Sequence, residues 1–315
     1  MPRSSLVRPL RAASLAVGLL VAAAAVALDG QATTPQAPGP APAAPRIPAI
    51  FVPPEPLNFA ERDGWTSLFD GRTLTGWDGN PEVWSVEAGA MTARSTAERR
   101  IGSTHVIWSG GEPADFELKL EMKLEGDIHS GIAYRSYVDV DRGSGGRQGA
   151  GAGARAGAGA GAGAVASAGA GAARSNAPAL AVPANPKWTL YGPGLDYDYD
   201  RLLAGNVEDR GSPRREVAWR GGMARAEPGV RPRLVGSLGD PDALMATLKA
   251  DDWNEIHIIA RGHQLTHIIN GHVMTVLTDD DPQYFRPAGL IGLQIEQYGL
   301  GRVSFRNVWL KQVKP

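Results

Sequence analysis

The chain contains no cysteine among its 315 residues. Disulfide bonds are therefore excluded, and so is a lipid anchor on a cysteine that follows a leader. The chain also lacks an excess of charge of either sign, because 32 basic side chains are balanced by 33 acidic ones. A polyanionic partner normally requires a basic surface, so we expect no nucleic-acid partner.

Long hydrophobic runs are scarce too, and the main one lies near the N-terminus. Three arginines precede an apolar run from about residue 12 to 27, which is short for a membrane span. Ala25-Val26-Ala27 matches a small-residue cleavage site. We predict a signal peptide at residues 1–27, export to the periplasm or the exterior, and no membrane span after cleavage. A retained N-terminal anchor is the alternative.

Two segments have compositions that cannot build a core. Residues 28–59 are rich in proline and alanine, which is typical of an extended linker. Residues 149–173 are mostly glycine and alanine, which offer little side-chain area to bury and are entropically costly to order. We therefore predict one folded domain at residues 60–315, interrupted by an insertion at about 141–186 between two strands.

The rest of the chain alternates apolar and polar residues with period two. In DFELKLEMKL (115–124), Phe116 and every second residue after it are apolar, and the residues between them are charged. Segments 130–136, 288–297 and 303–313 also read as strands, and helical periodicity appears only near 240–252. Many short strands with glycine-rich turns predict an all-β sandwich of two antiparallel sheets.

The stretch WNEIHIIARGHQLTHIINGHV (253–273) holds four of the six histidines. Gly262-His263 and Asn270-Gly271 are typical two-residue hairpin turns, so the stretch predicts a three-stranded meander. Counting from these turns places His257 and His267 on opposite faces of the sheet. Metal ligands must converge to about 2 Å from one ion, so these histidines predict no shared metal site. We expect His267 to be a core residue hydrogen-bonded to backbone.

Five blocks of sequence, taken in order, resemble the 3-keto-disaccharide hydrolase family. They are GWTSLFDGRTLTGW (64–77), WSVEAGAMTA (84–93), DFELKLEMKL with SGIAYRS (115–136), DDWNEIHIIARGHQLTHIINGHV (251–273) and GLIGLQIEQYGLGRVSFRNVWLKQ (289–312). The resemblance implies a concanavalin A-like jelly-roll sandwich that binds carbohydrate over a concave sheet. It also implies cleavage of glycosides oxidised at C3, either as a hydrolase or as a lyase.

This chemistry sets the kind of site to look for. A 3-keto group acidifies the C2 proton, so a base can form an enolate that expels the C1 substituent, and water can add to the resulting enone. The site needs a base, an acid or cation for the leaving oxygen, and a stabiliser for the enolate.

Strand alternation predicts a polar face that suits an oxygen-rich ligand. If the apolar rows point inward, four polar side chains point outward: Glu121, Arg135, Gln294 and Glu296. A solvated face with incidental ion pairs is the alternative. His129 stands at a strand entrance where many family members have asparagine, and its ordinary pKa suits a general base. We expect His129 or Glu296 to be the base and Arg135 to be the enolate or hydroxyl partner.

Residues 195–222 are dense in charge and aromatic side chains. Asp196, Asp198 and Asp200 would share one face of a strand, which is consistent with carbohydrate binding or with a divalent metal such as calcium, although the EF-hand pattern is broken. The segment GNVEDRG resembles a family segment and adds Glu208 and Asp209 as candidates. Trp188 and Trp219 flank this region as candidate sugar platforms.

Three functions remain open at this point. The first is an exported enzyme that cleaves 3-keto-glycosides, with catalytic candidates Glu121, His129, Arg135, Glu208 and Glu296. The second is a non-catalytic, lectin-like carbohydrate-binding module of the cell envelope, because one fold hosts both activities. The third is a structural envelope protein. The oligomeric state, the metal content and the natural aglycone are left open.

Overall fold

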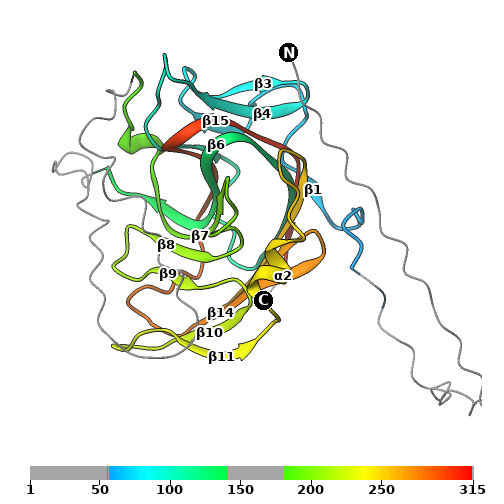
Figure 1. Ribbon diagram of the computed structural model, residues 1–315, viewed down its shortest axis with the longest axis vertical. Coiled ribbons are helices and arrows are strands. Elements are labelled where there is room, and N and C mark those ends of the chain that lie inside the picture. Colours follow the sequence, from blue (N-terminus) through cyan, green and yellow to red (C-terminus); the bar gives the residue numbers. More distant parts are fainter. Residues whose placement is uncertain (1–54, 56, 141–180, 314–315) are drawn as a thin grey trace, which may run out of the picture. The chain divides into compact units, whose positions relative to one another are not determined.

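The computed structural model describes residues 55, 57–140 and 181–313. The signal peptide predicted at 1–27, most of the predicted linker and the Gly/Ala tract lie outside the described residues. The described part is almost entirely β, which confirms the predicted fold class (Figure 1). Its helical turns are a 3-10 helix, η1 (Pro186–Trp188), and a short helix, α2 (Pro241–Met245), whose N-terminus is capped by the Asp240 carboxylate.

Two long strands, β6 (Phe116–Val138) and β15 (Leu290–Gln312), organise the fold. They pair with each other along most of their length and pass through both layers of the sandwich. Figure 1 shows them curving together through the fold, with β3 and β4 on one side and β7, β8 and β9 on another. We call the two layers the meander sheet and the site sheet.

The meander sheet contains the first half of β6 and the second half of β15. Its strand order is β11-β10-β14-β13-β12-β6-β15-β4-β3, and β1 pairs with β15. The additional strands are β1 (Thr66–Ser67), β3 (Ser85–Glu87), β4 (Ala90–Ser95), β10 (Gly222–Ala226), β11 (Arg233–Ser237), β12 (Asn254–Arg261), β13 (Gln264–Ile269) and β14 (His272–Asp279).

The site sheet contains the second half of β6 and the first half of β15. The pairings give the order β2-β5-β15-β6-β7-β8-β9. Its other strands are β2 (Trp77–Gly79), β5 (Thr104–Trp108), β7 (Leu190–Asp198), β8 (Val207–Arg210) and β9 (Arg215–Ala218). Strands β6 and β7, which flank the predicted insertion, are antiparallel neighbours.

The sequence predicted separate strands at 115–124 and 130–136, and again at 288–297 and 303–313. The structure joins each pair into one strand that bends without ending. Gly126 and Gly299 take φ values of +82° and +80°, which glycine adopts without steric cost. A Cβ on Gly126 would lie 2.9 Å from the carbonyl oxygen of Leu300. Glycine therefore allows both strands to turn from one sheet into the other while staying hydrogen-bonded.

The histidine-rich stretch forms the predicted meander of β12, β13 and β14. His257 pairs with Ile268 and His267 with Ile258, so the two histidines face opposite sides, as predicted. His267 is fully buried, with its Nδ1 3.1 Å from the carbonyl oxygen of Gly205 and its Nε2 2.7 Å from the Tyr134 hydroxyl. The prediction of a core histidine bonded to backbone is confirmed.

Two details depart from simple expectation. The prediction of purely antiparallel sheets is wrong for one pair, because β10 and β14 run parallel.

Lys119, expected on the exposed polar row of its strand, is 1% exposed because residues 58–65 cover it. Its Nζ donates to the Asn58 carbonyl and lies 4.3 Å from the centre of the Trp65 ring.

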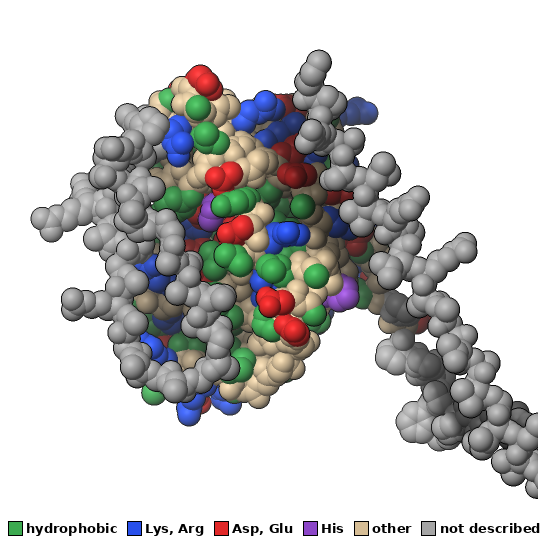
Figure 2. Space-filling view, in the orientation of Figure 1, with side chains coloured by type: hydrophobic (Ala, Val, Ile, Leu, Met, Phe, Trp, Pro, Cys, Tyr) green, Lys and Arg blue, Asp and Glu red, His purple; other side chains and the backbone are tan. Residues whose placement is uncertain are grey.

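The described surface carries charges of both signs. In Figure 2, basic, acidic and hydrophobic side chains are interspersed over the face shown, which agrees with the balanced composition. Within the described ranges, no helix is long and apolar enough to cross a membrane.

Candidate active site

The outer face of the site sheet collects polar side chains from four strands, β5, β15, β7 and β8, on either side of Gly131 of β6. Val207, Leu195 and Leu293 are buried in the core, so the residues that alternate with them point outward. The register then aligns four positions across β5, β15, β6 and β7: His105, Gln294, Gly131 and Asp196. Strand β8 adds Glu208 and Arg210 beside this row, and β15 adds Glu296.

Arg210 is the hub of this face. Its Nη2 donates to three acceptors: a Glu208 carboxylate oxygen at 2.8 Å, the Gln294 side-chain oxygen at 2.8 Å and a Glu296 carboxylate oxygen at 2.5 Å. The side chains of Arg210, Glu208 and Glu296 are only 20%, 23% and 11% exposed. Charge-assisted hydrogen bonds of this kind are short and strong, so the guanidinium fixes the positions of both carboxylates.

The cluster contains more negative than positive groups, so one carboxyl tends to keep its proton. Burial raises the pKa of Asp196 well above its usual value, and the charges of Glu208 and Glu296 raise it further. Burial also raises the pKa of Glu208, against the opposing effect of Arg210. Burial lowers the pKa of Arg210, but Glu208 and Glu296 outweigh it and hold the guanidinium charged. The site therefore places a carboxyl group that favours its protonated form beside two further carboxyl groups and a fixed cation.

One end of the site is closed by residues 186–190. The Nδ1 of His105 lies 3.2 Å from the carbonyl oxygen of Trp188 and 3.3 Å from the amide nitrogen of Leu190. Burial lowers the pKa of His105 to about 3, so its ring is neutral at neutral pH. Among the described residues, the Nε2 atoms of His105 and Gln294 have no hydrogen-bond partner. Two buried nitrogens without partners are what a site for a polar ligand would display.

The other end of the site is open and aromatic. His129 lies between two tyrosine rings, with ring centres 5.7 Å from Tyr199 and 5.9 Å from Tyr298. Both tyrosines are 45% exposed. Asp198 pairs with His129 across β6 and β7 and is 2% exposed. Burial, together with a hydrogen bond to Asp200 and its charge, raises the pKa of Asp198 to about 7.

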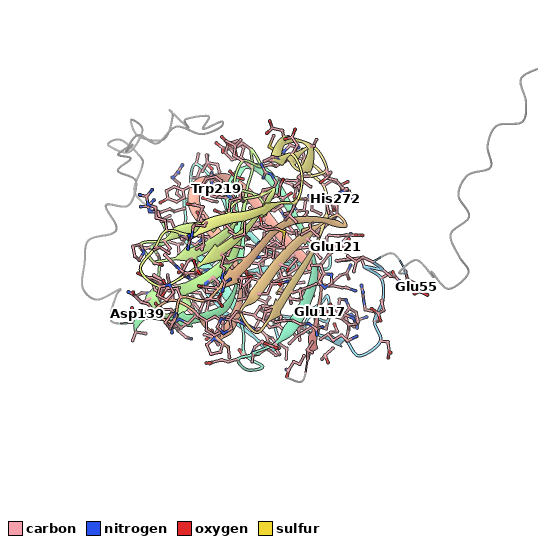
Figure 3. All side chains as sticks on the ribbon, turned by 90° about the horizontal axis from the view of Figure 1, so that it is seen from below. Glu55, Glu117, Glu121, Asp139, Trp219 and His272 are labelled. Carbon is pink, nitrogen blue, oxygen red and sulfur yellow. The ribbon has the colours of Figure 1, made fainter. Side chains whose placement is uncertain are left out.

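The structure brings together four of the residues singled out from the sequence: Asp196, Glu208, Gln294 and Glu296. Glu121 is not among them, because it lies on the half of β6 that belongs to the meander sheet. There it accepts hydrogen bonds from Arg306 and Asn307. Figure 3 shows Glu117 and Glu121 on the opposite side of the molecule from Asp139, which follows the other end of the same strand.

The prediction that Arg135 points outward onto this face is wrong. A register shift between Ala133 and Tyr137 breaks the alternation, and Arg135 has a φ of +46°. Its side chain is 1% exposed and donates to the carbonyls of Ala114 and Gly262 and to the Asp115 carboxylate. Arg135 therefore links β6 to the segment before it and to the turn after β12 through hydrogen bonds. The cation of the candidate site is Arg210.

Three further candidates lie away from the Arg210 cluster. Asp209 alternates with Glu208 and points to the other face, where Arg214 bonds both Asp209 and Asp279. The indole nitrogen of Trp188 donates to Asp78 at 2.9 Å. Trp219 is 57% exposed and follows the last residue of β9.

The sequence reasoning missed Arg210 and His105. Both could be found from strand alternation, because Val207 and Asp209 point inward and leave Glu208 and Arg210 outward. Only carboxylates and aromatic side chains of residues 195–222 were named as candidates, so Arg210 was omitted. The neutral state of His105 depends on its burial under residues 186–190. The two residues of this segment that contact its ring, Trp188 and Leu190, are 83 and 85 positions away in sequence, and the segment has no periodic pattern.

No group of three or more histidine, aspartate or glutamate side chains within residues 57–140 and 181–313 is arranged to hold a metal ion. Asp198 and Asp200 instead accept hydrogen bonds from the backbone amides of Leu203 and Leu202. The divalent metal considered from the D-x-D-x-D spacing stays a prediction.

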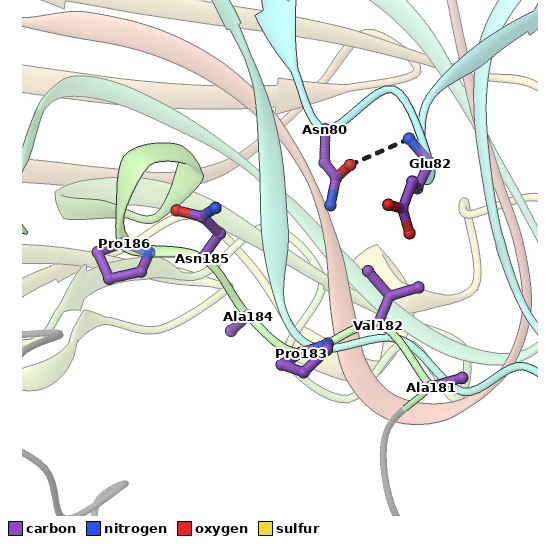
Figure 4. Close-up of a pocket in the computed structure, with 8 residues that line it drawn as sticks. All are labelled: Asn80, Glu82, Ala181, Val182, Pro183, Ala184, Asn185 and Pro186. Carbon is purple, nitrogen blue, oxygen red and sulfur yellow. Dashed lines mark hydrogen bonds between the residues drawn. The ribbon is translucent and has the colours of Figure 1, made fainter.

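A separate pocket of about 400 Å³ lies between residues 80–82 and 181–186 (Figure 4). Asn80 accepts a hydrogen bond from the Glu82 amide at its rim. Glu82 is the one titratable side chain among its described lining residues. The pocket therefore offers no pair of groups for acid and base catalysis, unlike the Arg210 cluster.

Comparison with known proteins agrees with the sequence resemblance. Residues 64–311 match the family described as the 3-keto-alpha-glucoside-1,2-lyase-like domain. The chain belongs to this family. No curated protein sequence matches the chain. The matched residues include all strands of the site sheet, the whole of β6 and all but the last residue of β15.

Several solved structures are similar to this chain at low identity. A putative glycosyl hydrolase from Parabacteroides distasonis ATCC 8503 is 13% identical, with a TM-score of 0.43 over 80% of this chain and 95% of that one. A second from the same organism is 18% identical, with a TM-score of 0.43 over 79% and 99%. The carbohydrate-binding module CBM66 from Bacillus subtilis is 10% identical, with a TM-score of 0.41 over 75% and 95%.

Proposed function

We propose that the chain is an exported enzyme that cleaves 3-keto-glycosides by removing the proton at C2 and expelling the C1 substituent. The observation that carries this proposal is the placement of Asp196, Glu208 and Glu296 around the single guanidinium of Arg210. The three roles that the reaction requires are a base, an acid and a cation that stabilises an enolate. Each has a matching group here.

We assign Glu296 as the base. Arg210 holds its carboxylate in place through a 2.5 Å hydrogen bond. Glu296 takes the C2 proton while the electrons of the C2–H bond pass into the C3 carbonyl as an enolate. Arg210 stabilises that enolate oxygen. The enolate then re-forms the ketone as the C1–O bond breaks and a C1–C2 double bond forms.

Asp196 is the acid. Because burial and the neighbouring carboxylates favour its protonated form, it can deliver a proton to the departing oxygen. The products are the free aglycone and an enone. Addition of water to C1 and C2 of the enone would complete a net hydrolysis. The buried Gln294 and His105 nitrogens supply donors for hydroxyl groups of the oxidised sugar.

The test is release of methanol from methyl 3-keto-α-glucopyranoside by the wild-type protein, with unoxidised methyl α-glucopyranoside as the control. We expect turnover of the first and none of the second, because only the 3-keto group acidifies C2. Turnover of the unoxidised glycoside at a similar rate would contradict the proposal. Sugar binding with no turnover of either compound would favour the lectin-like module.

A further inference from the structure

Strand β8 carries two groups of the candidate site, Glu208 and Arg210, but its own sheet holds it weakly. It is four residues long, and its neighbour β9, the last strand of the site sheet in the described part of the chain, is equally short. The register between β8 and β9 also shifts between Val207 and Glu208. A short strand beside an irregular sheet edge opens locally more readily than a central strand. The two groups therefore need support from outside the sheet.

A buried ion bridge on the inner face of β8 provides such support. Asp209 stands between Glu208 and Arg210 in sequence and points to the opposite face. The Nε and Nη2 atoms of Arg214 donate to its Oδ2 at 2.9 Å and 2.8 Å. The same guanidinium donates through Nη1 and Nη2 to both carboxylate oxygens of Asp279, at 2.9 Å each. Asp279 is the last residue of β14, so this Arg214 bridge joins the site sheet to the meander sheet.

The Arg214 bridge is buried and its geometry is fixed. The side chains of Arg214, Asp209 and Asp279 are 10%, 7% and 7% exposed. The Tyr284 ring packs on the guanidinium, with its centre 4.4 Å from Cζ. Burial alone would lower the pKa of Arg214, but hydrogen bonds and charge from Asp279 and Asp209 outweigh that effect and raise it. Contacts of a guanidinium with both oxygens of a carboxylate fix orientation as well as position, and loss of one partner leaves a buried charge uncompensated.

We propose that Arg214 is a positioning residue for the candidate site. Through Asp209 and Asp279 it holds β8 against β14, and so it fixes the backbone from which Glu208 and Arg210 project. This inference rests on the proposed function, in which Arg210 must meet the enolate oxygen. Arg214 lies on the other face of the strand and acts only through β8.

The first experiment measures amide hydrogen exchange of β8 by mass spectrometry. Asp279→Asn weakens the bridge from the meander sheet without changing β8, and Arg214→Lys removes the contacts with two oxygens. We expect the β8 amides to exchange about 10-fold to 100-fold faster in both variants, the effect of losing one hydrogen bond to a charged group. Unchanged exchange in both variants would overturn the proposal.

Arg135→Lys is the matched control. Arg135 is also a buried arginine paired with an aspartate, but its three partners, Ala114, Asp115 and Gly262, lie on neither β8 nor β14. Exchange of the β8 amides should stay at the wild-type rate in this variant. Equal acceleration in Arg135→Lys would show a general loss of stability and would overturn the specific role of the bridge.

The second experiment asks whether the bridge acts through Arg210. With methyl 3-keto-α-glucopyranoside, we expect Asp279→Asn to lower kcat/KM by about 10-fold to 100-fold, as small misplacements of reacting groups do. In the Arg210→Lys background, the same change should lower kcat/KM by less than about twofold, because the group that the bridge positions is already lost. Arg135→Lys should change kcat/KM by the same factor in both backgrounds.

The outcomes separate this inference from the proposed function. Equal factors for Asp279→Asn in the two backgrounds would overturn the positioning role, since a general loss of stability is additive with Arg210→Lys. If the wild-type protein does not turn over the oxidised glycoside, the proposed function fails. Hydrogen exchange of β8 then decides alone whether the Arg214 bridge holds the strand.

Discussion

Asp196 is buried among two other carboxylates and one guanidinium, and its stability cost and its proposed catalytic role have the same origin. Its raised pKa means that the folded state holds a proton that the unfolded state releases above the ordinary value of 3.8. Stability is therefore lost as pH rises from that value through the raised pKa.

Replacement of Asp196 by asparagine removes this loss. We expect Asp196→Asn to melt higher than wild type at pH 7 to 8, by about 2–4 °C for each 1 kcal/mol gained in a domain of this size. Turnover should fall by about 10²–10⁴-fold, as for loss of a general acid. Thermal melts across pH check the first claim. A Tm difference that does not shrink toward acid pH would contradict the assigned protonation.

Arg210 is the second residue whose chemistry decides the site. Its Nη2 bonds Glu208, Gln294 and Glu296 at once. Lysine keeps the charge, but its side chain is one bond shorter than the path to Nη2, so its ammonium cannot occupy the position of Nη2 among these three acceptors. We expect Arg210→Lys to lower kcat/KM by about 10²–10³-fold, the usual effect of losing one preorganised oxyanion donor. Arg135 lies away from the Arg210 cluster, so Arg135→Lys should lower the stability of the fold and is not equivalent to Arg210→Lys.

At the scale of elements, the packing of β6 between β15 and β7 at the middle of the site depends on Gly131. A Cβ there would lie 2.8 Å from the carbonyl oxygen of Leu195 and 3.1 Å from the side-chain oxygen of Gln294. Gly131→Ala should push Gln294 off Arg210 and lower kcat/KM by about 10²-fold, as small misplacements at reacting groups do.

The matched control is Gly236→Ala on β11, where the added Cβ meets the flexible Met223 sulfur at 3.2 Å. It should leave kcat/KM close to wild type. Equal kinetic losses in the two alanine variants would show that Gly131 has no special relation to the site.

The meander gives a prediction about stability alone. His267 joins Tyr134 on β6 and the Gly205 carbonyl, and all three lie in the core. His267→Ala removes the partner of the buried Tyr134 hydroxyl and opens a cavity, while the Gly205 carbonyl still accepts from the Thr275 hydroxyl. We therefore expect a loss of about 2–4 kcal/mol in unfolding free energy. Urea denaturation measures it. A loss below about 1 kcal/mol would mean that water replaces the ring without cost.

The same residue affects acid stability. Burial lowers the pKa of His267 to about 4 from its ordinary 6.5. The unfolded chain therefore binds a proton that the folded state does not in this range, and stability falls as pH drops from about 6.5 to 4. In His267→Ala the part of the decrease in unfolding free energy that His267 causes between about pH 6.5 and 4 should be absent.

For the whole molecule, alternation and turn residues were sufficient to predict the all-β fold, the meander and the opposed faces of His257 and His267. Alternation also placed Gln294 and Glu296 on the working face. It failed where the ladder is irregular: the register shift beside Arg135 turns that side chain inward, and bends at Gly126 and Gly299 separate Glu121 from Glu296. Contacts between strands far apart in sequence, such as Arg210 with Gln294, carry no local signal.

The central claim is that the Arg210 cluster removes the C2 proton of a 3-keto sugar. The most direct measurement compares turnover of methyl 3-keto-α-glucopyranoside with that of the same compound carrying deuterium at C2. The account predicts a primary isotope effect on kcat/KM in the wild-type protein and loss of turnover in Glu296→Gln. Cleavage at the same rate for both isotopologues, together with turnover of the unoxidised glycoside, would indicate direct displacement at C1 by paired carboxylates and contradict the account.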